Sequence, residues 1–176
     1  VSNGTPADDI NFAGFSTLNG NQANDTFVYD TSGVMPTVSG THVGGLVTDE
    51  ENTVDVNTGT NTFTITDADN GTVSGSNRVS FDFINVLMGN GSDTLAGRDT
   101  TNTWSIGTEN TLNAYTFSGF NALQGNDSVD NFTIASGTSF TGALTGGAEN
   151  DTFDLQGTAT TVDGEGDDDT FTIYAG

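Results

Sequence analysis

Apolar and polar residues alternate in short segments of this chain, and one arrangement of them returns at a fixed interval near the C-terminus. Residues 144–157 (LTGGAENDTFDLQG) and 162–176 (VDGEGDDDTFTIYAG) share an aliphatic residue, a Gly, an Asp, and then Phe and Leu or Ile at alternate positions. The Asp residues of the two copies, Asp151 and Asp169, are 18 residues apart. A unit of this length cannot bury its own apolar face, so it must stack on copies of itself.

Weaker copies of the same pattern occur upstream, beginning at Leu18, Leu87 and Leu123. The segments NTFTI (residues 61–65) and NTWSI (residues 102–106) precede the last two copies and also alternate. Thr, Val, Phe and Ile dominate these segments, and no helical spacing is sustained. The sequence therefore predicts an all-β fold, a right-handed parallel β-solenoid (β-helix or β-roll) of stacked short coils, with Phe153 and Phe171 pointing inward.

The chain reads as a single β-solenoid segment, residues 1–176, cut from a longer repeat array. Residues 31–52 contain Pro36, several Gly residues and an acidic run, and they are predicted to be an irregular insertion or loop. Two strands are expected on either side of a turn at Gly59. Each repeat turn begins with a Gly, as at Gly125 and Gly146. We expect these Gly residues to have positive φ, which glycine adopts more readily than other residues.

The charge balance restricts the possible partners. The chain has 24 acidic and two basic residues and a formal net charge of −22. Such a charge repels nucleic-acid phosphates and anionic lipid surfaces, so neither nucleic acid nor membrane insertion is expected. The absence of Cys excludes disulfides, thiolate nucleophiles and cysteine-ligated zinc.

The acidic turns raise the question of a cation. If Asp151 and Asp169 stack one coil apart, two carboxylates about 5 Å from each other repel by roughly 1 kcal/mol in water and about 3 kcal/mol at an effective dielectric of 20. A divalent ion with oxygen ligands would convert this repulsion into cohesion. The alternative is that the Asp and Asn side chains bond backbone N–H groups in their turns.

Residues 146–154 (GGAENDTFD) resemble the calcium-binding nonapeptide of the repeats-in-toxin family, and residues 20–28 and 164–172 resemble it less closely. The resemblance implies calcium between successive turns of a parallel β-roll. Carried onto this chain, the ligand positions are Asp25, Asp130, Asp151 and Asp169. Asp167, which stands where the family has Gly, and Asn150 are further candidate metal ligands in the same turns. Asp93 is a weaker candidate because its turn is one residue shorter.

A longer stretch, residues 102–134, looks like the repeat of very large secreted and surface-attached bacterial proteins of the adhesin or haemagglutinin-like kind. This resemblance implies an extracellular or cell-surface location and a non-enzymatic structural or adhesive role. Its implied partners are a cell-surface or glycan partner, or another copy of the chain associated end to end.

Two other functions stay open. Arg78 and Arg98 could act in a polysaccharide-binding or polysaccharide-cleaving β-helix, although no cluster of unlike ionisable groups marks a catalytic site. Alternate Thr residues in residues 62–66 (TFTIT) could form an ice-binding face. His42, the one histidine, falls in the predicted loop, and no residue is assigned a catalytic role.

Overall fold

The computed structural model describes residues 17–20, 24–29, 33–34, 37–39 and 51–174. These residues form 17 strands and no helix, which confirms the prediction of an all-β chain. Within these ranges no segment has the length and apolar character of a membrane-spanning helix. The strands of the first half are β1 (Thr17–Asn19), β2 (Thr26–Tyr29), β3 (Gly33–Val34), β4 (Thr37–Ser39), β5 (Thr53–Val56), β6 (Asn61–Ile65), β7 (Gly71–Gly75) and β8 (Asn77–Asp82). Those of the second half are β9 (Val86–Ala96), β10 (Thr103–Ile106), β11 (Asn110–Leu112), β12 (Tyr115–Asn126), β13 (Asn131–Ile134), β14 (Ser139–Gly147), β15 (Thr152–Leu155), β16 (Thr158–Glu165) and β17 (Thr170–Ile173).

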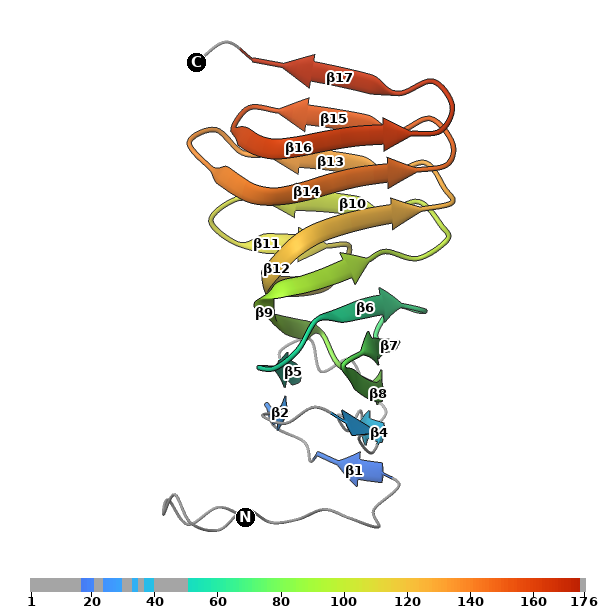
Figure 1. Ribbon diagram of the computed structural model, residues 1–176, viewed down its shortest axis with the longest axis vertical. Helices are drawn as coiled ribbons and strands as arrows, with labels where there is room; N and C mark the ends of the chain where they lie inside the picture. The colour runs from blue at the N-terminus through green and yellow to red at the C-terminus, as the bar shows by residue number, and fades with distance from the viewer. Residues whose placement is uncertain (1–16, 21–23, 30–32, 35–36, 40–50, 175–176) are drawn as a thin grey trace.

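The strands form one large sheet of mixed orientation, layered along the long axis of the molecule from β1 to β17 (Figure 1). The described pairs are parallel except in two places, where β6, β7 and β8 and then β10, β11 and β12 pair antiparallel. The prediction of a wholly parallel arrangement is wrong there, because tight turns return the chain beside the strand it has just left. Only Asn113 and Ala114 separate β11 from β12, and Asn113 has a φ of 52°.

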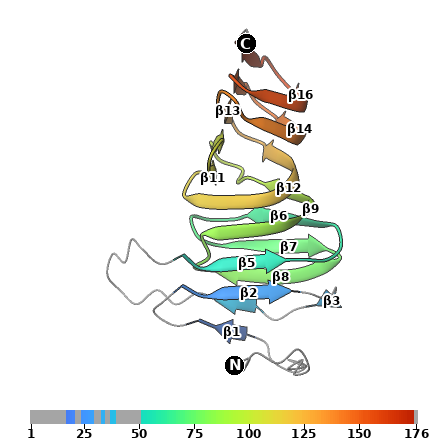
Figure 2. The ribbon, with the colours of Figure 1, turned by 90° about the vertical axis from the view of Figure 1, so that its left-hand side faces the viewer.

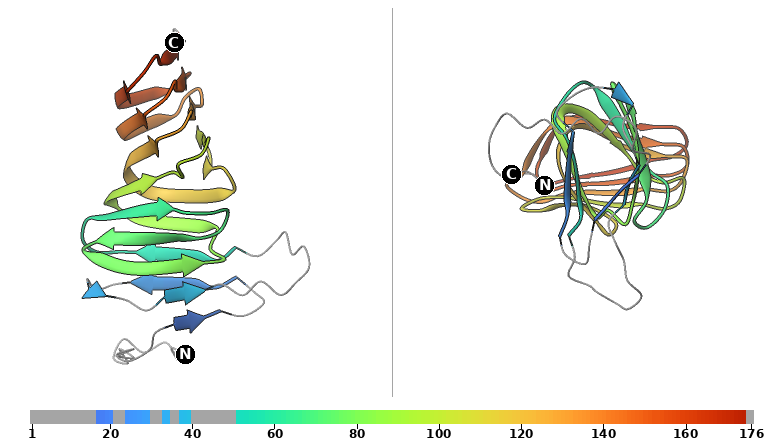
Figure 3. Two further views of the ribbon diagram at one scale, coloured as in Figure 1. Left: turned by 90° about the vertical axis from the view of Figure 1, so that its right-hand side faces the viewer. Right: turned by 90° about the horizontal axis from the view of Figure 1, so that it is seen from below.

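Parallel pairing arranges most of the other strands in three rows. The first row contains β2, β5 and the initial parts of β9 and β12. The second row contains β6, the final parts of β9 and β12, then β14 and β16. The third row contains β10, β13, β15 and β17. Viewed along the long axis, the chain runs around a shared interior (Figure 3).

We call the stretch of chain from one strand of a row to the next strand of that row a coil. The length of the coils in the third row decreases toward the C-terminus. Residues at the same position before β10, β13, β15 and β17 are separated by 28, 21 and 18 residues in turn. The predicted 18-residue offset is thus confirmed for the last pair of strands. Figure 2 shows the matching change in shape, a stack that is broad around β6 to β9 and narrow at β16.

Aromatic side chains of the third row stack directly on one another. Trp104, Phe132, Phe153 and Phe171 occupy one register position, with ring centroids separated by 5.3, 5.0 and 4.8 Å and nearly parallel planes. Trp104 is fully buried, as expected of the residue that occupies in NTWSI the position of Phe63 in NTFTI, whereas Phe171 at the end of the row is 46% exposed. The inward direction predicted for Phe153 is confirmed.

A second apolar column runs through the second row, where Phe63, Leu95, Leu123, Leu144 and Val162 are successive register partners. One predicted alignment is wrong at this point. Leu87 was matched with Leu123 as the start of a repeat, but it pairs with Val54 and Phe117 in the first row. The copy from Leu87 to Leu95 runs from the first row to the second, whereas the copy from Leu123 to Phe132 runs from the second row to the third.

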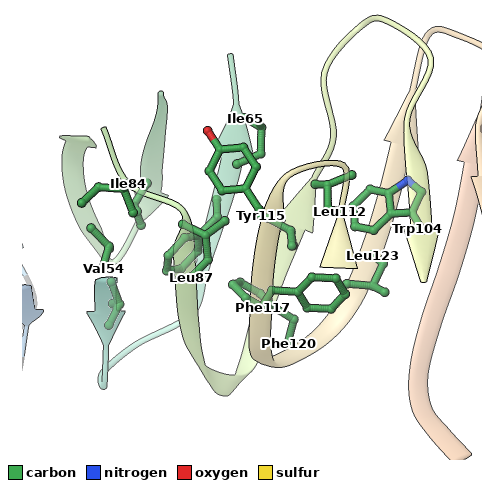
Figure 4. Packing of buried hydrophobic residues seen from close by; sticks show 14 of the residues in the cluster. Val54, Ile65, Ile84, Leu87, Trp104, Leu112, Tyr115, Phe117, Phe120 and Leu123 are labelled. Carbon is green, nitrogen blue, oxygen red and sulfur yellow. The ribbon is translucent and has the colours of Figure 1, made fainter. Parts of the chain in front are cut away.

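The interior is filled by side chains from several strands (Figure 4). Leu112 and Phe117 pack beside Trp104, and Tyr115 is the register partner of Leu112 on β12. Phe120 meets Phe63 edge to face at 4.9 Å. Burying each such side chain stabilises the fold by about 1.5–3 kcal/mol relative to leaving it in water.

The two strands predicted around Gly59 are confirmed as β5 and β6, and Gly59 has a φ of 77°. In the predicted loop, residues 31–52, the structure places the short strands β3 and β4. Residues 40–50, including His42, lie outside the described residues, so the irregular path of this loop stays a prediction.

Candidate functional site: a column of Asn and Asp side chains

The predicted metal ligands Asp130, Asp151 and Asp169 each lie one residue before or at the start of a third-row strand and follow one another along the stack. Each uses Oδ1 to accept a hydrogen bond from a backbone N–H of the preceding coil. The Asp130 N–H donates to Asp151 at 2.7 Å, and the Asp151 N–H donates to Asp169 at 2.9 Å. These side chains therefore join successive coils. The sequence had suggested, as one alternative, that they bond backbone N–H groups of their own turns.

Asparagines continue this arrangement upstream, and sequence reasoning missed them. The Asn102 N–H donates to Asp130 Oδ1 at 2.7 Å, and the Asn61 N–H donates to Asp93 Oδ1 at 2.8 Å. Closer to the N-terminus, the Asp25 N–H donates to Asn52 Oδ1 at 3.0 Å. We call Asn52, Asn61, Asp93, Asn102, Asp130, Asp151 and Asp169 the inter-coil column. Asn52 belongs to the first row, Asn61 and Asp93 belong to the second, and the other four follow one another in the third. Its sequence signal is the Asn or Asp that begins an alternating segment such as NTFTI, NTWSI or DTFDL.

The second polar atom of each side chain distinguishes the Asn members from the Asp members. Asn102 Nδ2 donates to the carbonyls of Arg98 at 2.9 Å and Gly125 at 3.3 Å. Asn61 Nδ2 likewise donates to the Thr58 carbonyl at 3.0 Å. By contrast, Oδ2 of Asp130 and Oδ2 of Asp151 are buried and have no hydrogen-bond partner within the described part of the chain. An amide thus satisfies this position, whereas the Asp130 and Asp151 carboxylates each leave one oxygen unpaired. Asp93 differs from these two, because its Oδ2 accepts the Asn90 N–H at 3.0 Å.

The glycines that precede these Asp residues are required for a reason other than the positive φ expected from the sequence. Gly125, Gly146 and Gly164 do not have positive φ, so that prediction is wrong. A Cβ at any of them would overlap Oδ2 of the Asp that follows five residues later. Glycine is required because the carboxylate rests against the backbone. Positive φ occurs instead at turn residues such as Asn126, at 85°, and Asp167, at 69°.

Burial dominates the electrostatics of the inter-coil column. It raises the pKa of the Asp130 carboxyl from 3.8 to about 7, a rise that hydrogen bonds from Asn102 oppose and the charge of Asp151 reinforces. Burial also raises the pKa of Asp151, with the backbone bond from Asp130 acting against the rise and the charge of Asp169 adding to it. The Asp130 and Asp151 carboxyls are therefore held in a setting that favours their neutral form.

The other predicted ligands lie on exposed turns at one edge of the stack. Asp167 Oδ2 accepts the Glu149 N–H at 3.1 Å, and Asn150 Oδ1 accepts the Asp168 N–H at 3.1 Å. Asp25 lies at the other end of the stack, before β2. Within the described ranges, no three His, Asp or Glu side chains come close enough together to form a metal-binding group.

One further polar cluster was not expected from the sequence. With its amide oriented to donate, Asn70 bonds the carboxylate of Asp69 at 2.8 Å and that of Asp82. The Tyr115 hydroxyl donates to the Asp67 and Asn70 carbonyls, both at 3.2 Å, and burial and the nearby acids raise the pKa of this hydroxyl. These contacts tie the turn between β6 and β7 to the core.

Comparison with protein families, with curated proteins and with solved structures found no match for this chain. The adhesin-like and repeats-in-toxin resemblances therefore stay predictions, and the functional interpretation depends on the geometry described above.

Proposed function

We propose that this chain is a non-enzymatic structural and adhesive module of a large bacterial surface or secreted protein. In this proposal the parallel rows are the faces of a right-handed β-solenoid interrupted by two hairpins, and the module acts as a stiff spacer. The observation that carries it is the inter-coil column. In this column Asn52, Asp93, Asp130, Asp151 and Asp169 each use Oδ1 to hold a backbone N–H group of a neighbouring coil.

Stiffness follows from how these bonds are distributed. Every coil of the third row is fixed to the next by backbone pairing, by a stacked aromatic ring and by one bond of the inter-coil column. Sliding one coil past another by a single residue would break all three contacts at once and would turn each ring outward. A rod with this coupling suits a protein that must hold a binding surface away from a cell.

Calcium remains part of the proposal, and the geometry favours the exposed turns over the buried column for it. Oδ1 of Asp130 and Asp151 already accepts a backbone N–H, and Oδ2 is enclosed against a glycine. The turns that carry Asn150, Asp167 and Asp168 place carboxylate and amide oxygens at the surface, where an ion with six to eight oxygen ligands could complete its shell with water.

A direct test combines binding with turnover. The folded chain would be applied to an array of bacterial and host glycans, and the same glycans in solution would be assayed for released reducing ends. Binding without release supports an adhesive module, and absence of both supports a spacer. Time-dependent release of reducing ends that is abolished in the heat-unfolded protein would overturn the proposal in favour of a polysaccharide-cleaving enzyme.

A further inference from the structure

The turn between β6 and β7 lies beside two other segments of the chain. β6 pairs with β7, and β7 in turn pairs with β8, where Gly71 is the partner of Phe81. On the other side of β6, Thr64 pairs with Ala96 at the end of β9. The residues that follow these pairs therefore lie next to one another, with Arg98 on one side of the turn and the segment after β8 on the other.

Ionisable side chains of both signs gather around this turn. Burial raises the pKa of the Tyr115 hydroxyl most, and the charges of Asp69, Arg98, Asp67 and Asp82 also act on it. Because four charges from three segments act on one hydroxyl, these side chains surround a common point. We call Asp67, Asp69, Asn70, Asp82, Phe83 and Arg98 the hairpin corner. The sequence showed no cluster of unlike ionisable groups, since only the hairpins bring Arg98 and Asp82 together.

Hydrogen bonds hold two carboxylates of the hairpin corner side by side. The Asn70 amide donates to Asp69 at 2.8 Å and also to Asp82. The Ile84 N–H donates to the Asp69 carbonyl at 3.0 Å, and the Tyr115 hydroxyl donates to the Asn70 carbonyl at 3.2 Å. A carboxylate can accept about four hydrogen bonds, so the bond from Asn70 leaves the Asp82 carboxylate able to accept others.

Arg98 brings hydrogen-bond donors to the same corner. Within the described part of the chain, its hydrogen bonds are made by its backbone N–H and carbonyl, with Asn102 as the partner of both. Its side-chain Nε is buried and has no partner among these residues. A guanidinium carries five N–H donors and no acceptor. The hairpin corner thus combines carboxylate acceptors with donors that the described residues do not use.

Phe83 adds an apolar surface beside these polar groups. It is 37% exposed and is the only exposed aromatic side chain in the described part of the chain before β17. Its φ of 55° is uncommon for an aromatic residue, and the Asn52 amide fixes the backbone there by donating to the Phe83 carbonyl at 3.1 Å. Residues held in such strained conformations cluster at binding and active sites.

We propose that the hairpin corner binds neutral hexose glycans, an inference that rests on the proposed adhesive function. A sugar hydroxyl both donates and accepts hydrogen bonds, so neighbouring hydroxyls can donate to Asp82 and accept from Arg98. The apolar CH face of the same sugar ring packs on the aromatic face of Phe83. Uronates and phosphorylated sugars are repelled, because the chain carries a net charge of −22 and three of its acids lie at this corner.

Nuclear magnetic resonance titrations of the whole chain with cellohexaose, maltohexaose and mannohexaose, with a chelator present, test the proposal. At least one of these neutral hexamers should shift the amide signals of residues 66–71, 82–84 and 97–99 more than those of the other residues. Hexagalacturonate, an acidic hexamer of similar size, should leave the same signals unchanged at the same concentration.

Matched variants separate binding from folding. Phe83→Leu keeps an apolar side chain but removes the aromatic face, so it should raise the Kd of the hexamer about threefold to tenfold, whereas Phe83→Tyr should leave it unchanged. Asp82→Asn should weaken binding to a similar extent. Asp127→Asn, which removes one charge from an exposed turn elsewhere, should have no effect on binding. Thermal melting of each variant shows whether the fold is retained, and the titration of the wild type decides the case of any variant that unfolds.

Two results would overturn this inference and leave the adhesive function standing. One is a hexamer, or a glycan of the array, that binds the chain while these amide signals stay unchanged, and the other is undiminished binding by folded Phe83→Leu and Asp82→Asn. Tighter binding of hexagalacturonate or of hexalysine at the same amides would also contradict it, because it would assign the corner to an acidic glycan or to a basic peptide. If no hexamer and no array glycan binds at all, both the inference and the adhesive role fail, and the spacer role remains.

Discussion

Replacing Asp130 by Asn should stabilise the protein at neutral and alkaline pH, although Asp130 is among its most buried polar residues. The substitution keeps Oδ1, which accepts the Asn102 N–H, and replaces the unpaired Oδ2 by an amide group. An acceptor for that amide is at hand, because the Gly146 carbonyl borders the same space beside Gly125 as Oδ2 does. Asn102 makes the equivalent bond one coil earlier.

The size of the effect follows from the pKa of Asp130, which burial raises from 3.8 to about 7. A folded-state pKa above the unfolded value means that the group favours folding below pH 3.8 and that this contribution is lost as the pH rises through about 7. By pH 8 the loss reaches at most about 4 kcal/mol. Asp130→Asn should therefore match the wild type near pH 3.5 and exceed it by about 2–4 kcal/mol at pH 8.

The measurement is urea unfolding followed by circular dichroism, at pH values from 3.5 to 8, with a chelator present. Asp127→Asn is the matched control, since it makes the same chemical change on an exposed side chain in the same turn and should show no such pH-dependent gain. The repulsion among the remaining acids is common to all three proteins and cancels in the comparison. A variant that is less stable than the wild type at pH 8 would refute the reasoning, because it would mean that a favourable partner holds the carboxylate in its charged form.

Three other results are expected. Phe153→Ala should cost about 3–5 kcal/mol in chemical unfolding, and Phe171→Ala, which loses one stacked neighbour instead of two at a half-exposed site, should cost less than half as much; equal losses would contradict the stacked column. Gly146→Ala should lower the free energy of unfolding by at least about 2 kcal/mol, because the added Cβ overlaps Asp151 Oδ2. In a double-mutant cycle, Gly146→Ala combined with Asp151→Ala should cost less than the sum of the two single changes. Strictly additive costs would contradict the proposed contact between Gly146 and Asp151. Millimolar calcium should raise the melting temperature more than magnesium does, and identical melting curves in calcium and in chelator would remove calcium from the proposed function.

Much of the third row could be predicted because its signal is local. Alternation in the segments around Phe132, Phe153 and Phe171 marks each strand, and an equal offset of Leu144 and Asp151 from their later copies gives the register of the last coils. The hairpins were harder to predict. Asn70-Gly71 is a strong hairpin dipeptide that could have shown the turn after β6, but Asn113-Ala114 carries no comparable signal.

The role of the inter-coil column could not be predicted from any one segment. It requires knowing that Asn102, Asp130 and Asp151 lie above one another although the coils between them differ in length. The prediction of positive φ at the turn Gly residues was wrong for a related reason. Their requirement comes from contact with the Asp five residues later, as at Gly146, and a backbone preference explains the same sequence equally well.

The decreasing coil length gives the molecule a mechanical signature. Hydrogen bonds between coils are directed along the stack, so tension applied between the two ends of the stack acts along these bonds. The coils then detach one at a time, beginning at the narrow end. A fully extended chain spans about 3.4 Å per residue, so coils of 18, 21 and 28 residues release about 60, 70 and 95 Å of contour length. A single molecule held under force should therefore lengthen in steps that increase as unfolding proceeds. The size of each step then shows how many coils have already detached.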